Sequence, residues 1–213
     1  MAGVVVLDHG SGNLRSAERA LVRAGASVTV TADVGLAAEA DGLVVPGVGA
    51  YAACMAGIEA IGAGPVIADR VAAGRPVLGI CVGMQVLFEA GEEHGVTTKG
   101  LGLLPGTVTR LAAVRVPHMG WNTVATPPGS TLFAGAAPED RYYFVHSYAA
   151  VRTGADVLVT TAVHEVGFVA AVEAYGGVLA ATQFHPEKSG DAGARLLRNW
   201  VAGVDARRGP GES

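Results

Sequence analysis

A cysteine framed by glycines is the side chain of this sequence best placed for chemistry. Cys81 lies between Gly79 and Gly83, after an apolar run and before a helical pattern. A Gly-x-Cys-x-Gly turn is typical of a nucleophile elbow, in which small neighbours let the chain turn sharply and project the central side chain. We therefore predict that Cys81 is a nucleophile, although an isolated free cysteine is more often a small buried hydrophobic residue.

A nucleophilic cysteine needs a base, and His185 is the best candidate among the 6 histidines. His185 follows an apolar strand, and Pro186 favours extended backbone at His185, which places residues 185 and 187 on the same side. Glu187 is then expected to orient the imidazole and stabilise its cation. The competing interpretation is an ordinary loop with a surface carboxylate. The other histidines have no comparable acidic neighbour.

A glycine-rich turn at residues 46–49 is a second candidate part of the site. Its glycines, with Ala52, match the Gly-x-Gly-x-x-Gly/Ala dinucleotide pattern, but the turn follows the third expected strand and no acidic residue ends a later strand at the right distance. The alternative is an oxyanion hole made by the N–H groups of Val48 and Gly49. A phosphate loop at Gly10 and Gly12 is disfavoured because the third glycine is missing.

Several elements must position these residues. Strands at 3–7, 27–31 and 42–45 and before Cys81 alternate with helical patterns at 14–24, 50–60, 65–73 and 82–90. This alternation predicts a parallel, doubly wound sheet. A helix that begins near Val82 would also favour the Cys81 thiolate through its unpaired N–H groups. Asn13 is expected to cap the first helix.

The second half of the chain is expected to be β-rich. Strands are predicted at 107–111, 142–148, 157–163, 168–175 and 178–182, an irregular loop at 116–122 and a final helix at 189–204. The aromatic side chains of 142–148 are expected in the core, and the end of that strand could line a pocket. We predict one domain over residues 1–205 and a flexible tail over residues 206–213.

Composition excludes several classes of function. The chain has 213 residues, a net charge of -4, no long basic block and 2 cysteines without metal-ligand spacing. We therefore expect no metal and no nucleic acid or membrane as partner. No apolar run approaches the ~18 residues that cross a bilayer, and no secretory signal is recognised, so a cytoplasmic location is expected.

Three motifs, at residues 46–49, 79–85 and 183–187, together resemble those of the class I (triad) glutamine amidotransferases. The resemblance covers nearly the whole chain. It implies a flavodoxin-like three-layer α/β fold with a central, mostly parallel sheet. It also implies hydrolysis of L-glutamine by a triad of Cys81, His185 and Glu187, without a cofactor. His9 departs from the tyrosine found in many relatives, but it lies outside the triad.

Residues 8–14, 118–122 and 143–148 look, within this family, like the glutaminase subunits of histidine biosynthesis. That resemblance implies a heterodimer with a (β/α)8-barrel cyclase subunit, which uses the ammonia to make imidazole glycerol phosphate. It further implies three groups of residues: oxyanion donors at Gly47, Val48, Gly49 and Val82; glutamine contacts at Gln85, Ser147 and Tyr148; and partner contacts at Asn13, Trp121 and Lys188.

Other functions remain compatible with the same sequence. One is a glutaminase subunit that serves another acceptor, such as pyridoxal phosphate synthase. Another is a non-catalytic binding or regulatory module, since a fold does not guarantee turnover. A cysteine peptidase is disfavoured, because it leaves the aromatic strand and the glycine-rich turn without a role.

Overall fold

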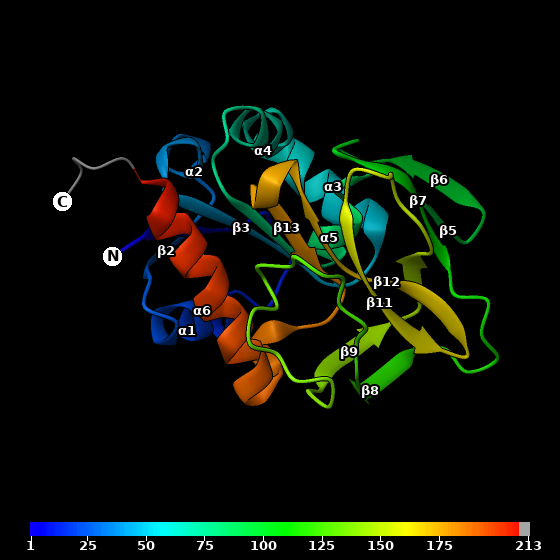
Figure 1. The fold of residues 1–213 in the computed structure, drawn as a ribbon. Coiled ribbons are helices and arrows are strands. Elements are labelled where there is room, and N and C mark those ends of the chain that lie inside the picture. The colour runs from blue at the N-terminus through cyan, green and yellow to red at the C-terminus, as the bar shows by residue number, and fades with distance from the viewer. Residues whose placement is uncertain (209–213) are drawn as a thin grey trace.

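The computed structural model describes residues 1–208, which are built around a seven-stranded sheet (Figure 1). Its strand order is β11 (Leu158–His164), β12 (Val166–Ala174), β13 (Leu179–Thr182), β4 (Val77–Cys81), β3 (Gly42–Gly47), β1 (Gly3–Leu7) and β2 (Ser27–Thr31). The five strands from β13 to β2 run parallel. Strand β12 runs antiparallel to β13, and β11 runs antiparallel to β12. The expected mostly parallel sheet is confirmed.

Helices cover both faces of this sheet (Figure 1). One face carries α1 (Leu14–Arg23) and α6 (Gly190–Arg207), and the other carries α2 (Val34–Glu39), α3 (Tyr51–Ala60) and α4 (Ala63–Ala72). Every residue of β3 and β4 is buried as a result, as expected of aliphatic strands between two helical layers. Within residues 1–208 no single helix is long and apolar enough to cross a bilayer; the bent pair α3 and α4 passes that test only jointly.

Strands β5 to β10 form two smaller sheets beside the main one, toward the right of Figure 1. A four-stranded sheet has the order β10 (Tyr148–Ala150), β7 (Leu104–Arg110), β5 (Phe88–Glu93) and β6 (Val96–Lys99). The strands β8 (His118–Asn122) and β9 (Tyr142–His146) form an antiparallel pair. Two 3-10 turns, η1 (Tyr175–Gly177) and η2 (Pro186–Lys188), flank β13.

Two expected elements differ from the structure. The helix expected over 82–90 is the single turn α5 (Val82–Gln85). It ends there because the carbonyls of residues 86–88 accept N–H groups from residues 101–104, which pulls the chain into β5. The loop expected over 116–122 is in part strand β8, because the aromatic strand β9 gives it a hydrogen-bonding partner. The local periodicity of the sequence does not reveal either of these hydrogen-bonding partners, residues 101–104 and strand β9.

The start of helix α1 and the end of helix α6 differ from expectation. Asn13 occupies the N-cap position of α1, but its side chain makes no capping hydrogen bond; its carbonyl accepts the N–H groups of Ser16 and Ala17 instead. Residues 206 and 207, expected in the flexible tail, complete helix α6. Arg208 forms an ion pair with Asp41 at 3.3 Å. Residues 209–213 of the expected tail lie outside the described residues.

Glycines allow the strand ends around the elbow to pack at backbone contact. A Cβ at Gly83 would overlap the carbonyl oxygen of Val45, and a Cβ at Gly79 would lie 2.7 Å from the Gly83 carbonyl oxygen. A Cβ at Gly47 would lie 2.5 Å from the Gly83 nitrogen. Since these neighbours are backbone atoms, they have little freedom to move aside. The turn that carries Cys81 is therefore fixed against β3.

We expect Gly83→Ala to destabilise the fold by about 3 kcal/mol, because the new methyl group must displace backbone of β3. Urea unfolding followed by circular dichroism measures the change. Gly167→Ala is the matched control, because a Cβ there meets no atom within 4 Å. Equal stability of Gly83→Ala and the parent chain would contradict the packing described.

Candidate active site

Cys81 ends strand β4 with a backbone that only glycine adopts easily. Its φ is 57° and its ψ is -116°, so the residue lies in a strained region of conformational space. Pairing of β4 with β3 and β13 on either side, including Gly47 opposite Cys81, holds the strand in place. A strained residue at the turn from strand to helix is the geometry of a nucleophile elbow.

His185 lies beside this cysteine with Glu187 behind its ring. The Nδ1 atom of His185 is 2.8 Å from Oε1 of Glu187, and the side chains are 3% and 2% exposed. Burial lowers the pKa of His185, but hydrogen bonds and charge interactions with Cys81 and Glu187 outweigh it and raise the pKa to about 9. The imidazole is therefore cationic near neutral pH, as a thiolate partner requires.

Backbone contacts fix the loop that presents His185. The His185 N–H donates to the carbonyl of Tyr143 at 2.9 Å, and the Ser189 hydroxyl donates to the His185 carbonyl at 2.6 Å. Because β13 is the parallel neighbour of β4, the residues that follow these two strands meet at the same edge of the sheet. The fold thus brings together the two halves of the expected triad.

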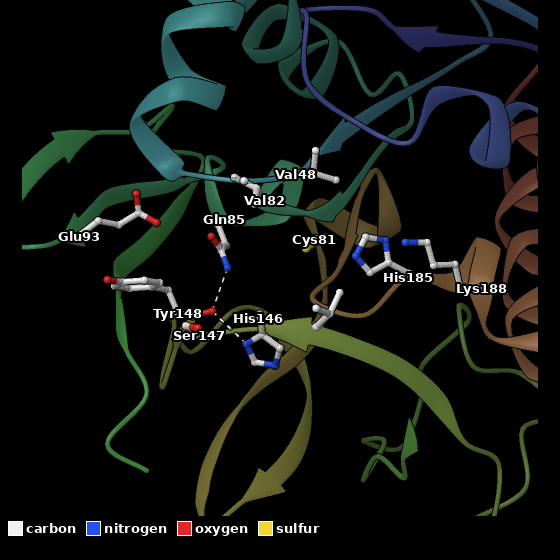
Figure 2. Close-up of a pocket in the computed structure, with 12 residues that line it drawn as sticks. Val48, Cys81, Val82, Gln85, Glu93, His146, Ser147, Tyr148, His185 and Lys188 are labelled. Atoms are coloured by element: carbon white, nitrogen blue, oxygen red, sulfur yellow. Dashed lines mark hydrogen bonds between the residues drawn. The ribbon is translucent and has the colours of Figure 1, made fainter. Parts of the chain in front are cut away.

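A cavity of about 240 Å³ opens in front of the cysteine (Figure 2). Nine of the residues singled out from the sequence line it: Val48, Gly49, Cys81, Val82, Gln85, Ser147, Tyr148, His185 and Lys188. Gly47 packs behind the elbow and Glu187 behind the imidazole. The prediction that the end of the aromatic strand lines a pocket is confirmed, and Tyr142 and Phe144 of that strand are core residues.

The glycine-rich turn is held by two residues of the loop after β1. The His9 ring nitrogen Nε2 donates to the Pro46 carbonyl at 2.6 Å. The Ser11 hydroxyl donates to the Val48 carbonyl at 2.8 Å and accepts the Val48 N–H at 3.1 Å. In this structure the Val48 N–H is therefore bonded to Ser11, so its expected role as an oxyanion donor requires that this bond breaks.

The dinucleotide interpretation of the same turn finds no support in the geometry. The N–H of Tyr51, at the start of α3, donates to the carboxylate of Glu93 at 2.9 Å. A bound pyrophosphate would have to accept the N–H groups at this helix N-terminus, and the Glu93 carboxylate would repel the pyrophosphate. Among residues 1–208 no group of three or more His, Cys, Asp or Glu side chains could hold a metal ion.

Three residues of the site were given no role by sequence reasoning. Glu93 and His146 line the cavity, and Gln183 donates its amide N–H to the Cys81 sulfur at 3.8 Å. Glu93 escaped notice because β5 was not expected. Gln183 belongs to the recognised motif and could have been found from its place two residues before His185. Cys54 is buried, and burial, then the nearby charge of Cys81, raises its thiol pKa to about 12.

The residues expected at a partner interface flank η2. Lys188 is in this turn, Asn13 directly precedes α1, and both α1 and β9 pack against η2. Trp121 on β8 is 54% exposed and contacts Tyr143 of β9 edge to face, with ring centroids 5.9 Å apart. Lys188 thus lies in η2, Asn13 adjoins a helix that packs against η2, and Trp121 is connected to η2 through β9.

Comparison with known proteins agrees with this geometry. The family model "Glutamine amidotransferase class-I" matches residues 5–204. The chain belongs to the class I glutamine amidotransferase family. This match includes the elbow, the glycine-rich turn and the histidine loop of the amidotransferase.

Individual relatives narrow the comparison. The amidotransferase is 63% identical over 200 residues to a protein of Mycolicibacterium paratuberculosis (93% of this chain, 96% of the relative), and 63% identical over 203 residues to one of Mycobacterium tuberculosis (94% and 98%). Both relatives are named imidazole glycerol phosphate synthase subunit HisH. A crystal structure titled glutamine amidotransferase shares the fold, with a TM-score of 0.75 at 23% identity over 95% of this chain and 98% of that one.

The titration of His185 predicts how stability depends on pH. Since its pKa rises from 6.5 to about 9 on folding, its contribution, about 3 kcal/mol, is complete below pH 6.5 and is lost as the pH rises through 9. Glu187→Gln should lose less stability over this window, because one of the two groups that raise the pKa is removed.

Urea unfolding of both proteins from pH 6.5 to 9.5 measures this difference. Burial lowers the pKa of His118 to about 4 and of His146 to about 3, so these residues reduce stability only as the pH falls below 6.5 and do not interfere. Identical pH slopes for Glu187→Gln and the parent would show that the carboxylate does not stabilise the imidazolium.

Proposed function

We propose that this amidotransferase hydrolyses L-glutamine to L-glutamate and ammonia and delivers the ammonia to a cyclase subunit. The acceptor reaction is the synthesis of imidazole glycerol phosphate and aminoimidazole carboxamide ribotide in cytoplasmic histidine biosynthesis. The main observation in support is the convergence of Cys81, His185 and Glu187 on a cavity. High identity to relatives named as subunits of imidazole glycerol phosphate synthase supports the acceptor.

The chemistry follows from the charged pair at the end of the sheet. The Cys81 thiolate attacks the side-chain amide carbon of glutamine, and the carbonyl oxygen becomes an oxyanion. The His185 imidazolium protonates the amide nitrogen, the carbon–nitrogen bond breaks and ammonia leaves. Neutral His185 then takes a proton from water, whose oxygen attacks the thioester; glutamate departs and the thiolate is restored. Glu187 orients the ring throughout.

The cavity has groups of suitable charge for an amino acid. Gln85, Ser147 and Tyr148 lie on its wall, and Glu93 lies across the cavity from His185 (Figure 2). The Glu93 carboxylate is placed to bind the α-ammonium group of glutamine when the side-chain amide reaches the sulfur. Such a pair fixes the direction in which the substrate enters.

The oxyanion needs N–H donors, and one of them is engaged elsewhere. The N–H of Val82 at the elbow and an N–H of the Gly47–Gly49 turn would bind the developing charge, a type of contact worth ~3 kcal/mol per donor. The Ser11 hydroxyl now holds Val48 through both its N–H and its carbonyl, that is, through the two peptide groups on either side of this residue. We infer that ligand binding in the cyclase selects a rotated turn, in which the donor faces the cavity.

Coupling to a partner explains why the turn at residues 46–49 would be closed in the chain alone. Ammonia released into water becomes protonated and loses its nucleophilicity, so hydrolysis without an acceptor is wasteful. A heterodimer with a (β/α)8-barrel cyclase, contacting Asn13, Trp121 and Lys188 around η2, would receive ammonia directly. The Lys188 side chain both lines the cavity and is exposed, which suits a residue at such an interface.

The deciding experiment is a glutaminase assay of the chain with and without the cyclase subunit and the cyclase's ligand. Glutamate release should rise at least 100-fold when both are present, because one oxyanion donor alone is worth 10²–10³ in rate. Cys81→Ala should abolish release in every condition. Equal rates with and without the cyclase ligand would contradict the proposed coupling, and activation by a pyridoxal phosphate synthase instead would reassign the acceptor.

Ser11→Ala tests the closed state of the turn. Removing the hydroxyl deletes two hydrogen bonds that hold the Val48 peptide, so the rate without cyclase ligand should rise about 5- to 10-fold, with a smaller change when ligand is present. Ser16→Ala, in helix α1, is the matched control and should keep the parent rates. If Ser11→Ala keeps the parent's unstimulated rate, this serine does not hold the turn closed.

A further inference from the structure

One backbone carbonyl in the active site accepts two side-chain donors. The Tyr148 carbonyl oxygen accepts Nε2 of Gln85 at 2.9 Å and Nδ1 of His146 at 3.0 Å (Figure 2). A carbonyl can only accept, so the Gln85 amide must present its NH₂ group and His146 must carry its proton on Nδ1. This oxygen therefore fixes the direction of every hydrogen bond connected to it.

The bonds on one side lead to the nucleophile. Gln85 Nε2 also donates to Oε1 of Gln183 at 3.0 Å, and Nε2 of Gln183 donates to the Cys81 sulfur at 3.8 Å. If the Gln183 amide were reversed, two NH₂ groups would face each other and an oxygen would face the sulfur. Gln183 is 1% exposed, so reversing its amide would leave buried polar atoms without suitable partners. The direction set at Tyr148 thus determines that an N–H faces Cys81.

The bonds on the other side lead away to the pair of strands β8 and β9. Neutral His146 with its proton on Nδ1 accepts at Nε2, and the donor is Nδ1 of His118 at 3.0 Å. His118 in turn accepts at Nε2 from the Asn122 amide at 3.3 Å, and that amide also donates to the Val163 carbonyl at 2.9 Å. The bonds form one continuous series with a single direction from Asn122 to Tyr148.

Both histidines must be neutral for this series to hold. Burial lowers the pKa of His118 to about 4 and that of His146 to about 3. The rings packed around His118 are those of Phe144, His146, His164 and Phe168. None of these rings carries a negative charge that would stabilise a cationic His118. His146 also faces the cationic His185, so a second positive charge there would compete with the imidazolium for the thiolate.

We propose that His146, supported by His118, is a positioning residue for the glutaminase reaction: its Nδ1–H holds the Tyr148 carbonyl so that Gln85 orients the Gln183 amide N–H toward the Cys81 sulfur. Gln183 is then the group that touches the reacting atom and stabilises the thiolate, together with His185. The effect of His146 on the reaction rests on the proposed glutaminase function. The orientation of Gln183 is a property of the chain alone.

Two amide substitutions of His146 separate this role from simple space filling. The side-chain nitrogen of Asn reaches the place of Nδ1, whereas that of Gln reaches the place of Nε2. His146→Asn therefore keeps a donor for the Tyr148 carbonyl and His146→Gln does not. Gln183→Glu replaces the N–H at the sulfur by a carboxylate oxygen of nearly the same shape.

Two measurements are made on each folded variant. The first is the rate of Cys81 alkylation by iodoacetamide against pH in the chain alone, with Cys81→Ala used to subtract reaction at Cys54. The second is kcat and KM for glutamine in the complex with cyclase and its ligand. For His146→Gln and Gln183→Glu we expect a shift of the alkylation profile of about 1 pH unit upward and a loss of at least 10-fold in kcat, with KM within about 3-fold. His146→Asn should stay within about 3-fold of the parent in kcat.

Opposite results overturn the proposal. If His146→Gln folds and keeps both the parent alkylation profile and the parent kcat, or if His146→Asn is impaired as much as His146→Gln, the Nδ1 donor has no positioning role. If His146→Gln does not fold, Gln183→Glu decides alone: an unchanged profile rejects the assignment. A parent complex that releases no ammonia would contradict the proposed function instead, and the alkylation profiles would still decide this inference.

Discussion

The close packing of a cysteine, a histidine and a carboxylate in an almost dry site is the constraint on which this molecule depends. Cys81 is 4% exposed and the side chains of His185 and Glu187 are 3% and 2% exposed. Buried charges are costly unless they are paired and hydrogen-bonded with good geometry. The sheet meets this requirement because β4 and β13 are parallel neighbours, so two residues distant in sequence emerge at one edge with a fixed separation.

The surroundings of these side chains divide into a rigid part and a part that can rearrange. Gly79 and Gly83 let the elbow contact neighbouring backbone directly, which leaves it little freedom. The turn at 46–49 is different: Val48 is exposed, Gly49 has a φ of 81°, and a single hydroxyl holds the Val48 peptide. In the proposed mechanism the nucleophile and the base are fixed and the oxyanion donor is adjustable, so binding elsewhere can control the rate without moving the reacting groups.

How far the sequence predicts this structure depends on whether the relevant contacts are local. The elbow, the His185–Glu187 pairing and the parallel sheet follow from residues close together in the chain, and the structure has all three. The short helix α5, the strand β8 and the position of the Glu93 carboxylate depend on partners distant in sequence. Local hydrophobic periodicity cannot predict such partners. The His118–His146 pair also escaped prediction, because the two histidines are 28 residues apart in sequence and meet only through the pairing of β8 with β9.

The positive φ of Cys81 has a consequence for how this protein can vary. Only glycine is relaxed in that conformation, so Cys81→Gly would remove backbone strain together with the sulfur of the proposed nucleophile. The chain thus keeps a less stable backbone at the position of the proposed nucleophile. A glycine would be more stable at this position, so the strain at Cys81 agrees with the role proposed for its sulfur.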